Sequence, residues 1–264
     1  MLTDEELDRY ARHLVLREVG GPGQARIRKA RLLIVGAGGL GSPAALYLAA
    51  AGVGTLGLVD DDAVSLSNLQ RQVLFATADV GRPKVEAGAE RLSALNPGVR
   101  VRTHHARVLA DNVMELIADY DIVLDGSDNF PTRFLLNDAC YFAAKTLVSA
   151  AVTEFEGQLA TYKAFDKTGP HPCYRCLFPE PPPPGTMPSC SETGVLGAAA
   201  GVMGSLAALE ALKEAAGVGA SLAGKVLTYR ALTTEFRTAR LPPDPACPLC
   251  GGDPVIRDLR VHAG

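Results

Sequence analysis

Apolar residues in this chain recur in two patterns, as short continuous runs and as longer stretches with helical spacing. Short runs bounded by turn residues are typical of buried strands, whereas repeats every three or four residues are typical of helices. Between residues 31 and 152 the two patterns alternate, as expected for parallel strands connected by helices. The expected strands are 32–35, 56–59, 99–103, 122–124 and 147–151. We therefore predict an α/β fold whose mainly parallel sheet is covered by helices on both faces.

The chain departs from this pattern at both ends. Thr3 and Glu6 have the spacing of a capping box and precede apolar residues on one face, which predicts an N-terminal helix ending near Gly20-Gly21-Pro22. Beyond residue 156 we expect three strands that extend the sheet in antiparallel fashion, a proline-rich crossover and a long apolar helix. The strands are 158–164, 226–231 and 235–239, the crossover is 179–185, and the helix is 194–216.

Composition narrows the class of protein. The formal net charge is −3 and no basic tract is visible, which excludes nucleic acid as the main ligand. The N-terminus lacks the basic and apolar regions of a secretory signal, and the longest uncharged run, 193–209, is too short and too rich in glycine to span a bilayer. We therefore expect a cytoplasmic protein with no nucleic-acid or membrane partner.

A glycine motif connects the first expected strand to a helical stretch. Gly36, Gly38 and Gly41 form Gly-x-Gly-x-x-Gly, which allows a tight turn and lets a phosphate approach free N–H groups at a helix N-terminus. Asp60 stands nineteen residues after Gly41, at the end of the second strand, where a carboxylate would bind ribose hydroxyls. A glycine-rich turn packed for its own sake is the alternative, but the strand, helix and acid favour nucleotide binding. The motif does not identify the nucleotide.

Residues suited to phosphate chemistry follow the glycine motif. Asn68 and Arg71 lie in the block Ser-Leu-Ser-Asn-Leu-Gln-Arg-Gln, and Lys84 opens the next helical stretch. Asp128 follows the fourth strand and is suited to holding Mg²⁺, with Arg133 one turn later. Each residue taken alone is more often a surface charge or a helix cap. Their shared position at strand ends favours one site and predicts phosphoryl or nucleotidyl transfer.

Four of the six cysteines form two Cys-x-x-Cys pairs. Cys173 and Cys176 precede the proline-rich crossover, and Cys247 and Cys250 lie near the end of the chain. This spacing predicts one tetrahedral Zn²⁺ site with a structural role, and it suits a reducing compartment. Redox dithiols are the alternative, but no thioredoxin-like context surrounds either pair. Cys190 lies between the crossover and the start of a helix, a position that favours a reactive thiolate over an inert free cysteine.

Taken in order, these motifs resemble those of the E1-like activating enzymes of the molybdopterin-synthase and thiamine-biosynthesis adenylyltransferase group. The resemblance runs from about Arg9 to Gly251. It implies a Rossmann-like fold and ATP-dependent adenylation of the C-terminal glycine carboxylate of a small ubiquitin-like sulfur carrier ending in Gly-Gly. Pyrophosphate would leave, and the carrier would be primed for thiocarboxylate formation in molybdopterin, thiamine or tRNA-thiolation pathways.

The resemblance also implies roles for single residues. The glycines of the turn would border the phosphates, Asp60 would hold the ribose, Asn68, Arg71 and Lys84 would grip phosphates, and Asp128 would be linked to Mg²⁺. Arg12 would reach the ATP of a partner subunit, which implies a homodimer with two shared sites. Cys190 resembles a crossover-loop cysteine that some members link to the carrier by a thioester or persulfide. The implied glycines are Gly36, Gly38, Gly39 and Gly41.

The expected organisation is a single adenylation domain over residues 1–264. It comprises a helical arm (1–28), a nucleotide-binding half (29–152) and a half with the carrier-binding, crossover and zinc segments (153–264). The chain leaves no room for an appended sulfurtransferase, so we expect a separate sulfur donor, a cysteine desulfurase or a sulfurtransferase.

Two alternatives remain. A NAD-dependent oxidoreductase would share the glycine motif and Asp60, but it leaves Arg71, Lys84 and Asp128 unexplained. A catalytically silent, zinc-stapled scaffold that binds a ubiquitin-like protein would have no use for those three residues either.

Overall fold

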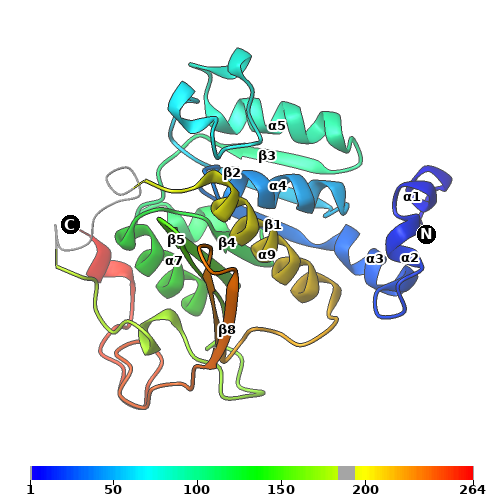
Figure 1. The fold of residues 1–264 in the computed structure, drawn as a ribbon. Coiled ribbons are helices and arrows are strands. Elements are labelled where there is room, and N and C mark those ends of the chain that lie inside the picture. Colours follow the sequence, from blue (N-terminus) through cyan, green and yellow to red (C-terminus); the bar gives the residue numbers. More distant parts are fainter. Residues whose placement is uncertain (1, 184–193, 264) are drawn as a thin grey trace.

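The computed structural model describes residues 2–183 and 194–263, and its described strands form one eight-stranded sheet (Figure 1). The strand order is β3-β2-β1-β4-β5-β6-β7-β8. The first five strands in this order pair in parallel, and β6, β7 and β8 continue the sheet in antiparallel fashion. The bounds are β1 Arg31–Val35, β2 Thr55–Val59, β3 Arg100–His104, β4 Ile122–Asp125, β5 Thr146–Thr153, β6 Glu156–Tyr162, β7 Lys225–Arg230 and β8 Glu235–Arg240.

Helices cover both faces of the sheet (Figure 1). Along β1, Leu32 and Ile34 join a core formed with α4, α5 and α9, whereas Leu33 and Val35 join a second core formed with α6 and α7. Alternate residues of one strand therefore serve opposite faces, which explains why the strand is an unbroken apolar run. The helices are α1 Asp4–Arg9, α2 Ala11–Leu14, α3 Gly20–Lys29, α4 Gly41–Ala50, α5 Lys84–Leu95, α6 Val113–Ala118, α7 Phe130–Phe142 and α9 Gly197–Ala216. The short 3₁₀ turns are η1 Leu66–Asn68, η2 Thr77–Asp79, η3 Tyr174–Cys176 and η4 Leu259–His262.

The predicted N-terminal helix is wrong in extent, although its capping box between Thr3 and Glu6 is present. The helix breaks at Tyr10, whose buried hydroxyl accepts a hydrogen bond of 2.9 Å from the Asn96 side chain. A new helix, α3, then begins at Gly20, where the prediction placed an end. Pro22 fits the first turn of α3 because the N–H that proline lacks has no partner there.

The second half of the chain follows the predicted pattern with shifted boundaries. The long apolar helix begins at Gly197 and stops before Gly217, whose φ of +62° ends it in a left-handed cap. α9 packs against α4 and α3 and against β5 and β6, so it covers the join between the parallel and antiparallel strands. No helix in the described ranges is long and apolar enough to cross a membrane.

Candidate active site

A cleft of about 1030 Å³ opens at the carboxyl ends of β1, β2 and β4. Parallel sheets of this type bind ligands at this edge because the loops that follow neighbouring strands converge there. The lining includes the carboxylates, the amide and the cations that the sequence placed around a nucleotide in the same chain, and all of the predicted glycines except Gly41, which begins α4 behind the turn. These residues are Gly36, Gly38, Gly39, Asp60, Asn68, Arg71, Lys84 and Asp128.

The turn between β1 and α4 requires glycine at two points. Gly36 has a φ of +88°, a conformation that residues with a side chain rarely adopt. A Cβ atom on Gly41 would lie 1.9 Å from the carbonyl oxygen of Gly36, so the first turn of α4 can pack only if this residue is glycine. The turn therefore brings bare backbone and the N-terminus of α4 to the cleft, an arrangement that binds phosphate.

Asp60, which directly follows β2, is hydrogen-bonded to the backbone of this turn. Its carboxylate accepts hydrogen bonds from the N–H groups of Ala37 (2.8 Å) and Asp62 (2.9 Å). Burial raises the pKa of Asp60, and the charge of Lys84 and the two N–H bonds oppose this rise. The carboxylate is thus held at a fixed place on the cleft wall, where a ribose could donate its hydroxyls.

Lys84, the first residue of α5, points its ammonium at the same corner. Its side chain is only 5% exposed, and Nζ lies 2.7 Å from Asp62 and 3.4 Å from Asp60. The backbone around it is fixed because Lys84 donates its N–H to the Asp62 carbonyl (3.0 Å) and Pro83 forms an isolated bridge with Ala63. The pairing of the segment 62–63 with the segment 83–84 therefore holds a buried cation at the cleft.

Asn68 and Arg71 line the cleft from η1 and the turn after it. The Asn68 side chain accepts a bond of 3.3 Å from the N–H of Ser65, and Arg71 donates to the carbonyl of Ser67 at 3.2 Å. The aliphatic part of Arg71 lies over Gly39, where an added Cβ would be 3.2 Å from it. Arg71 therefore packs against the glycine turn, and Asn68 lines the same cleft.

Asp128 and Arg133, which the sequence placed together in the site, have different environments. Asp128 is exposed on the cleft wall, and among described residues its carboxylate has no hydrogen-bond partner, so it could coordinate a hard cation such as Mg²⁺. Arg133 is buried and donates to the carbonyls of Ser127 (2.6 Å) and Ala150 (3.1 Å). Arg133 also lines the cleft, and these two hydrogen bonds hold the turn before Asp128.

Asp125 is a residue of the site region that the sequence analysis did not single out. Its fully buried carboxylate accepts bonds from the N–H of Ser127 (3.0 Å), the hydroxyl of Ser127 (2.6 Å) and the hydroxyl of Ser149 (2.9 Å). This network shapes the turn that presents Asp128. The Asp-Gly-Ser sequence was a usable signal, since aspartate commonly binds the backbone two residues later.

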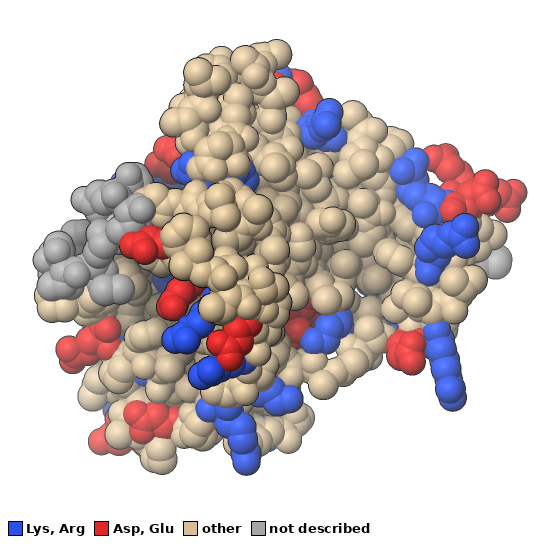
Figure 2. Space-filling model, viewed as in Figure 1, with Lys and Arg blue, Asp and Glu red and all other residues tan. Residues whose placement is uncertain are grey.

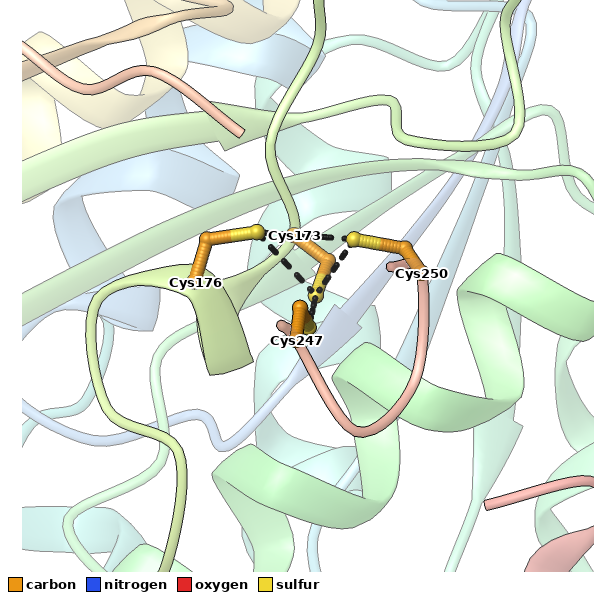
Figure 3. A group of neighbouring side chains, drawn as sticks. All are labelled: Cys173, Cys176, Cys247 and Cys250. Atoms are coloured by element: carbon orange, nitrogen blue, oxygen red, sulfur yellow. Dashed lines mark hydrogen bonds between the residues drawn. The ribbon is translucent and has the colours of Figure 1, made fainter. Parts of the chain in front are cut away.

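The four paired cysteines converge on one point (Figure 3). Their Sγ atoms lie 3.5 Å apart for Cys173 and Cys247, 3.4 Å for Cys176 and Cys250, 3.4 Å for Cys173 and Cys250, and 4.0 Å for Cys173 and Cys176. Four sulfurs bound tetrahedrally to one Zn²⁺ at about 2.3 Å would be roughly 3.8 Å apart. The cluster therefore has the chemistry and spacing of a closed zinc site, and none of its cysteines forms a disulfide.

An ion-pair cluster beside these cysteines was not predicted. Arg175, between two of them, binds the carboxylate of Asp138 at 2.8 and 3.1 Å through Nε, and the Nε2 of His262 lies 2.8 Å from the same carboxylate. Burial raises the pKa of Asp138, but the hydrogen bonds from His262 and Arg175 outweigh this and leave it below its ordinary value. The cluster joins α7, η3 and the C-terminal residues, and it fixes the segment that carries the first cysteine pair.

Arg12 and Cys140 lie outside the lining of the cleft, and the position of one further predicted residue is not described. Arg12 is exposed on α2, outside the residues that line the described cleft of its own chain, and α1 and α2 project at one end of the molecule (Figure 1). Cys190 lies outside the described residues. Cys140 is buried in α7, and burial raises the pKa of its thiol, which keeps it protonated.

The visible surface shows no extended patch of one charge. On the face drawn in Figure 2, lysine and arginine side chains are interspersed with aspartate and glutamate. This distribution agrees with the net charge of −3 and gives no footprint for a polyanion on that face.

Comparison with known proteins gives three levels of similarity. A family described as the ThiF family matches residues 10–249. A "Sulfur carrier protein adenylyltransferase" of Thermus thermophilus is 51% identical over 97% of this chain and 95% of its own length. A "SAMP-activating enzyme E1" of Haloferax volcanii is 50% identical over 98% and 94%. An "Adenylyltransferase and sulfurtransferase MOCS3" of Bos taurus is 50% identical over 99% of this chain but only 57% of its own length. Among solved structures, E. coli MccB superposes with a TM-score of 0.80 over 97% of this chain and 75% of its own length, and its 21% identity supports a shared fold alone.

Proposed function

This chain belongs to the ThiF family, and on that premise we propose that it adenylates the C-terminal glycine carboxylate of a small ubiquitin-like sulfur carrier. The observation that carries the proposal is the convergence of a phosphate-binding turn, a ribose-binding acid and several cations on one cleft. Relatives about half identical along nearly the whole chain are named for the same reaction class.

The proposed reaction is an attack by a carboxylate oxygen of the carrier on the α-phosphorus of ATP. The bond from the α-phosphorus to the bridging oxygen breaks, pyrophosphate leaves with the electron pair, and an acyl-adenylate remains. Negative charge must be neutralised on the nucleophile and on the leaving group, which explains why a cleft of this kind holds several cations. Hydride transfer needs none of them.

Roles for the lining residues follow from their positions. The glycine turn and the N-terminus of α4 would hold phosphate, and Asp60 would accept the ribose hydroxyls. Arg71 packs against Gly39 and Lys84 lies beside Asp60, so both are placed to stabilise charge on the phosphates, with Asn68 as a neutral donor. The carboxylate of Asp128, which bonds to no described residue, is suited to Mg²⁺, which would supply further neutralisation of the triphosphate.

The cysteine cluster would hold a structural Zn²⁺. All four sulfurs point at one another and leave no position for a substrate, as in closed structural sites (Figure 3). We assign the nucleotide-binding half to residues 29–152 and the carrier-binding and zinc segments to 153–264, within one adenylation domain that also includes the helical arm 1–28.

Further parts of the proposal concern partners. Because Arg12 lies outside the cleft of its own chain, its family role would require a second subunit, which supports a homodimer with shared sites. Sulfur would come from a separate donor, a cysteine desulfurase or sulfurtransferase, and Cys190 would form a thioester or persulfide link with the carrier. We place this chemistry in the cytoplasm.

The direct test is exchange of labelled pyrophosphate into ATP with Mg²⁺ and a panel of ubiquitin-like carriers ending in Gly-Gly. We expect exchange that depends on a carrier and disappears when its last glycine is removed. Oxidation of NADH without any exchange would instead support the oxidoreductase, and binding of a carrier without exchange would support a silent scaffold.

The role of Cys190 is tested separately. Mass spectrometry of the protein with ATP, Mg²⁺ and a carrier should show the adenylated carrier and a covalent adduct. Cys190→Ser should abolish the adduct and retain the adenylate. An adduct that persists in this variant would assign the link to another cysteine.

A further inference from the structure

Gln72 is the last residue of the block Ser65–Gln72, yet neither the fold nor the proposed roles explain its side chain. Its backbone is fixed by two turns, because its N–H donates to the Asn68 carbonyl (2.9 Å) and its carbonyl accepts from Phe75 (3.2 Å). The side chain is only 3% exposed but belongs to the cleft wall. A long polar side chain is therefore held rigidly at the edge of the nucleotide site.

The terminal amide of Gln72 is not used by the fold. Its Oε1 atom is buried and has no hydrogen-bond partner in the described part of the chain. It is the only side-chain atom of that kind there. An unpaired buried carbonyl costs free energy, and structures commonly retain such a group because it serves a ligand or holds a functional geometry.

The position of Nε2 indicates which ligand atom it meets. A Cβ atom built on Gly38 would be 3.9 Å from Nε2, so the amide nitrogen lies beside the backbone of the glycine turn. Gly38 lines the cleft at the point where the turn lets phosphate approach the backbone. Phosphate oxygens accept hydrogen bonds and donate none, so the amide nitrogen is the matching group.

We propose that Gln72 is a further substrate-contacting residue, whose Nε2 donates a hydrogen bond to a phosphate oxygen of ATP over the Gly38 turn. In this orientation of the amide Nε2 lies beside the turn, whereas the reverse orientation would turn an acceptor toward an anion. This donor is neutral, unlike Arg71 and Lys84, and among described residues it has no carboxylate partner such as those of Lys84. The inference rests on the proposed use of ATP.

The test compares three glutamines with the same substitution. Gln72→Met keeps the length of the side chain and removes both polar atoms. Gln24→Met removes an amide that is fully buried and paired, with contacts of 2.8 Å to His13 and 2.9 Å to the Ala51 carbonyl. Gln70→Met changes an exposed residue outside the cleft wall.

Binding of ATP with Mg²⁺ is measured by titration calorimetry without a carrier, and stability by denaturant unfolding. We expect Gln72→Met to weaken ATP binding roughly tenfold, the effect of one hydrogen bond to a charged group, and to retain or raise stability. Gln70→Met should leave ATP affinity unchanged, whereas Gln24→Met should lose stability. Gln72→Glu, which keeps the acceptor and replaces the donor by a negative charge, should weaken binding further.

The outcomes separate this inference from the function on which it rests. Failure of the wild-type protein to bind ATP would overturn both. Tight binding of ATP by wild type and by Gln72→Met alike would overturn the inference alone. A loss of stability in Gln72→Met with unchanged affinity would show that Oε1 has a structural partner such as a buried water, and it too would overturn the inference.

Discussion

The Nζ atom of Lys84 lies 2.7 Å from the carboxylate of Asp62, although the two side chains differ greatly in exposure, 5% against 70%. The ammonium thus has a partner at the mouth of the cleft and a second, buried one in Asp60 at 3.4 Å. A phosphate entering the cleft would meet a cation whose outer partner is exposed to water and easily displaced.

Lys84→Met should therefore lower the rate of pyrophosphate exchange by roughly 10²–10³-fold, the usual effect of removing one group that stabilises developing charge. Asp62→Asn should lower it by less than about tenfold, because Asp60 still holds the ammonium in place and the exposed pair contributes little. Exchange assays and thermal melts of both variants check this. Equal losses in the two would show that Asp62 takes part in the reaction itself.

Substitution of Asp128 should affect activity, whereas substitution of Asp125 should affect stability. Asp128→Asn should abolish exchange and change the free energy of unfolding by less than about 0.5 kcal/mol, because the side chain is exposed and bonds to no described residue. Asp125→Asn should cost about 1–3 kcal/mol, since its amide would face the donors that the buried carboxylate now accepts. Unfolding curves and exchange rates on the same preparations measure both effects. A strong destabilisation by Asp128→Asn would contradict the assignment.

The cysteine cluster should hold one zinc ion in each chain, measurable by elemental analysis. Cys173→Ser should lose the metal and about 3 kcal/mol of stability or more, which lowers the melting temperature of a domain of this size by roughly 6–12 °C. Cys140→Ala provides the control, because this buried cysteine is not one of the four clustered thiols and its loss should leave metal content unchanged. Full metal content in Cys173→Ser would count against a four-sulfur site.

Stability should depend on pH through Asp138. Hydrogen bonds from His262 and Arg175 keep its pKa below the ordinary value despite burial. The contribution of this carboxylate to the free energy of unfolding is therefore complete above its pKa in the unfolded chain, which is about 3.9. It is lost as the pH falls from that value through the lower pKa of the folded protein. Asp138→Asn should cost about 3–5 kcal/mol at neutral pH, because Arg175 loses its buried partner. Unfolding at several pH values should show the difference between variant and wild type shrinking below pH about 4; a constant difference would exclude this linkage.

The shared-site dimer can be tested by mixing two inactive variants. Arg12→Ala and Lys84→Met should each abolish exchange alone. In a mixed dimer one site regains both residues, so random reassortment should restore roughly a quarter of the wild-type sites. Exchange assays after co-refolding or co-expression measure the recovery. Activity in Arg12→Ala by itself, or no recovery on mixing, would remove Arg12 from the partner's site.

The sequence predicted most of the parallel sheet because β1, β2 and β4 are buried on both faces and therefore read as unbroken apolar runs. It did not predict the break at Tyr10. The Asn96 side chain that binds the Tyr10 hydroxyl lies 86 residues away, and helical spacing contains no information about it.

The site was predictable to the extent that its residues follow strands and occupy local motifs. Asp60, Lys84 and Asp128 reach one cleft because parallel strands end at one edge. The pairing of Asp138 with Arg175 and His262 joins positions 37 and 124 residues apart, for which no short motif exists. The sequence placed Arg133 near the site, and the structure puts it in the cleft lining, but its bonds to two backbone carbonyls could not be read from a local motif.

The cysteine cluster also sets the connectivity of the second half of the chain. With a metal ion bound, two cysteines 74 residues apart are joined, and the chain between them becomes a closed ring that contains α9, β7 and β8. A single cut within that ring would leave both fragments attached through sulfur and through strand pairing. The same metal link restricts the unfolded chain. Part of the metal's contribution to stability therefore comes from the lower conformational entropy of the unfolded state. A nicked protein would therefore separate into two fragments only after the ion is removed and the strand pairing is lost.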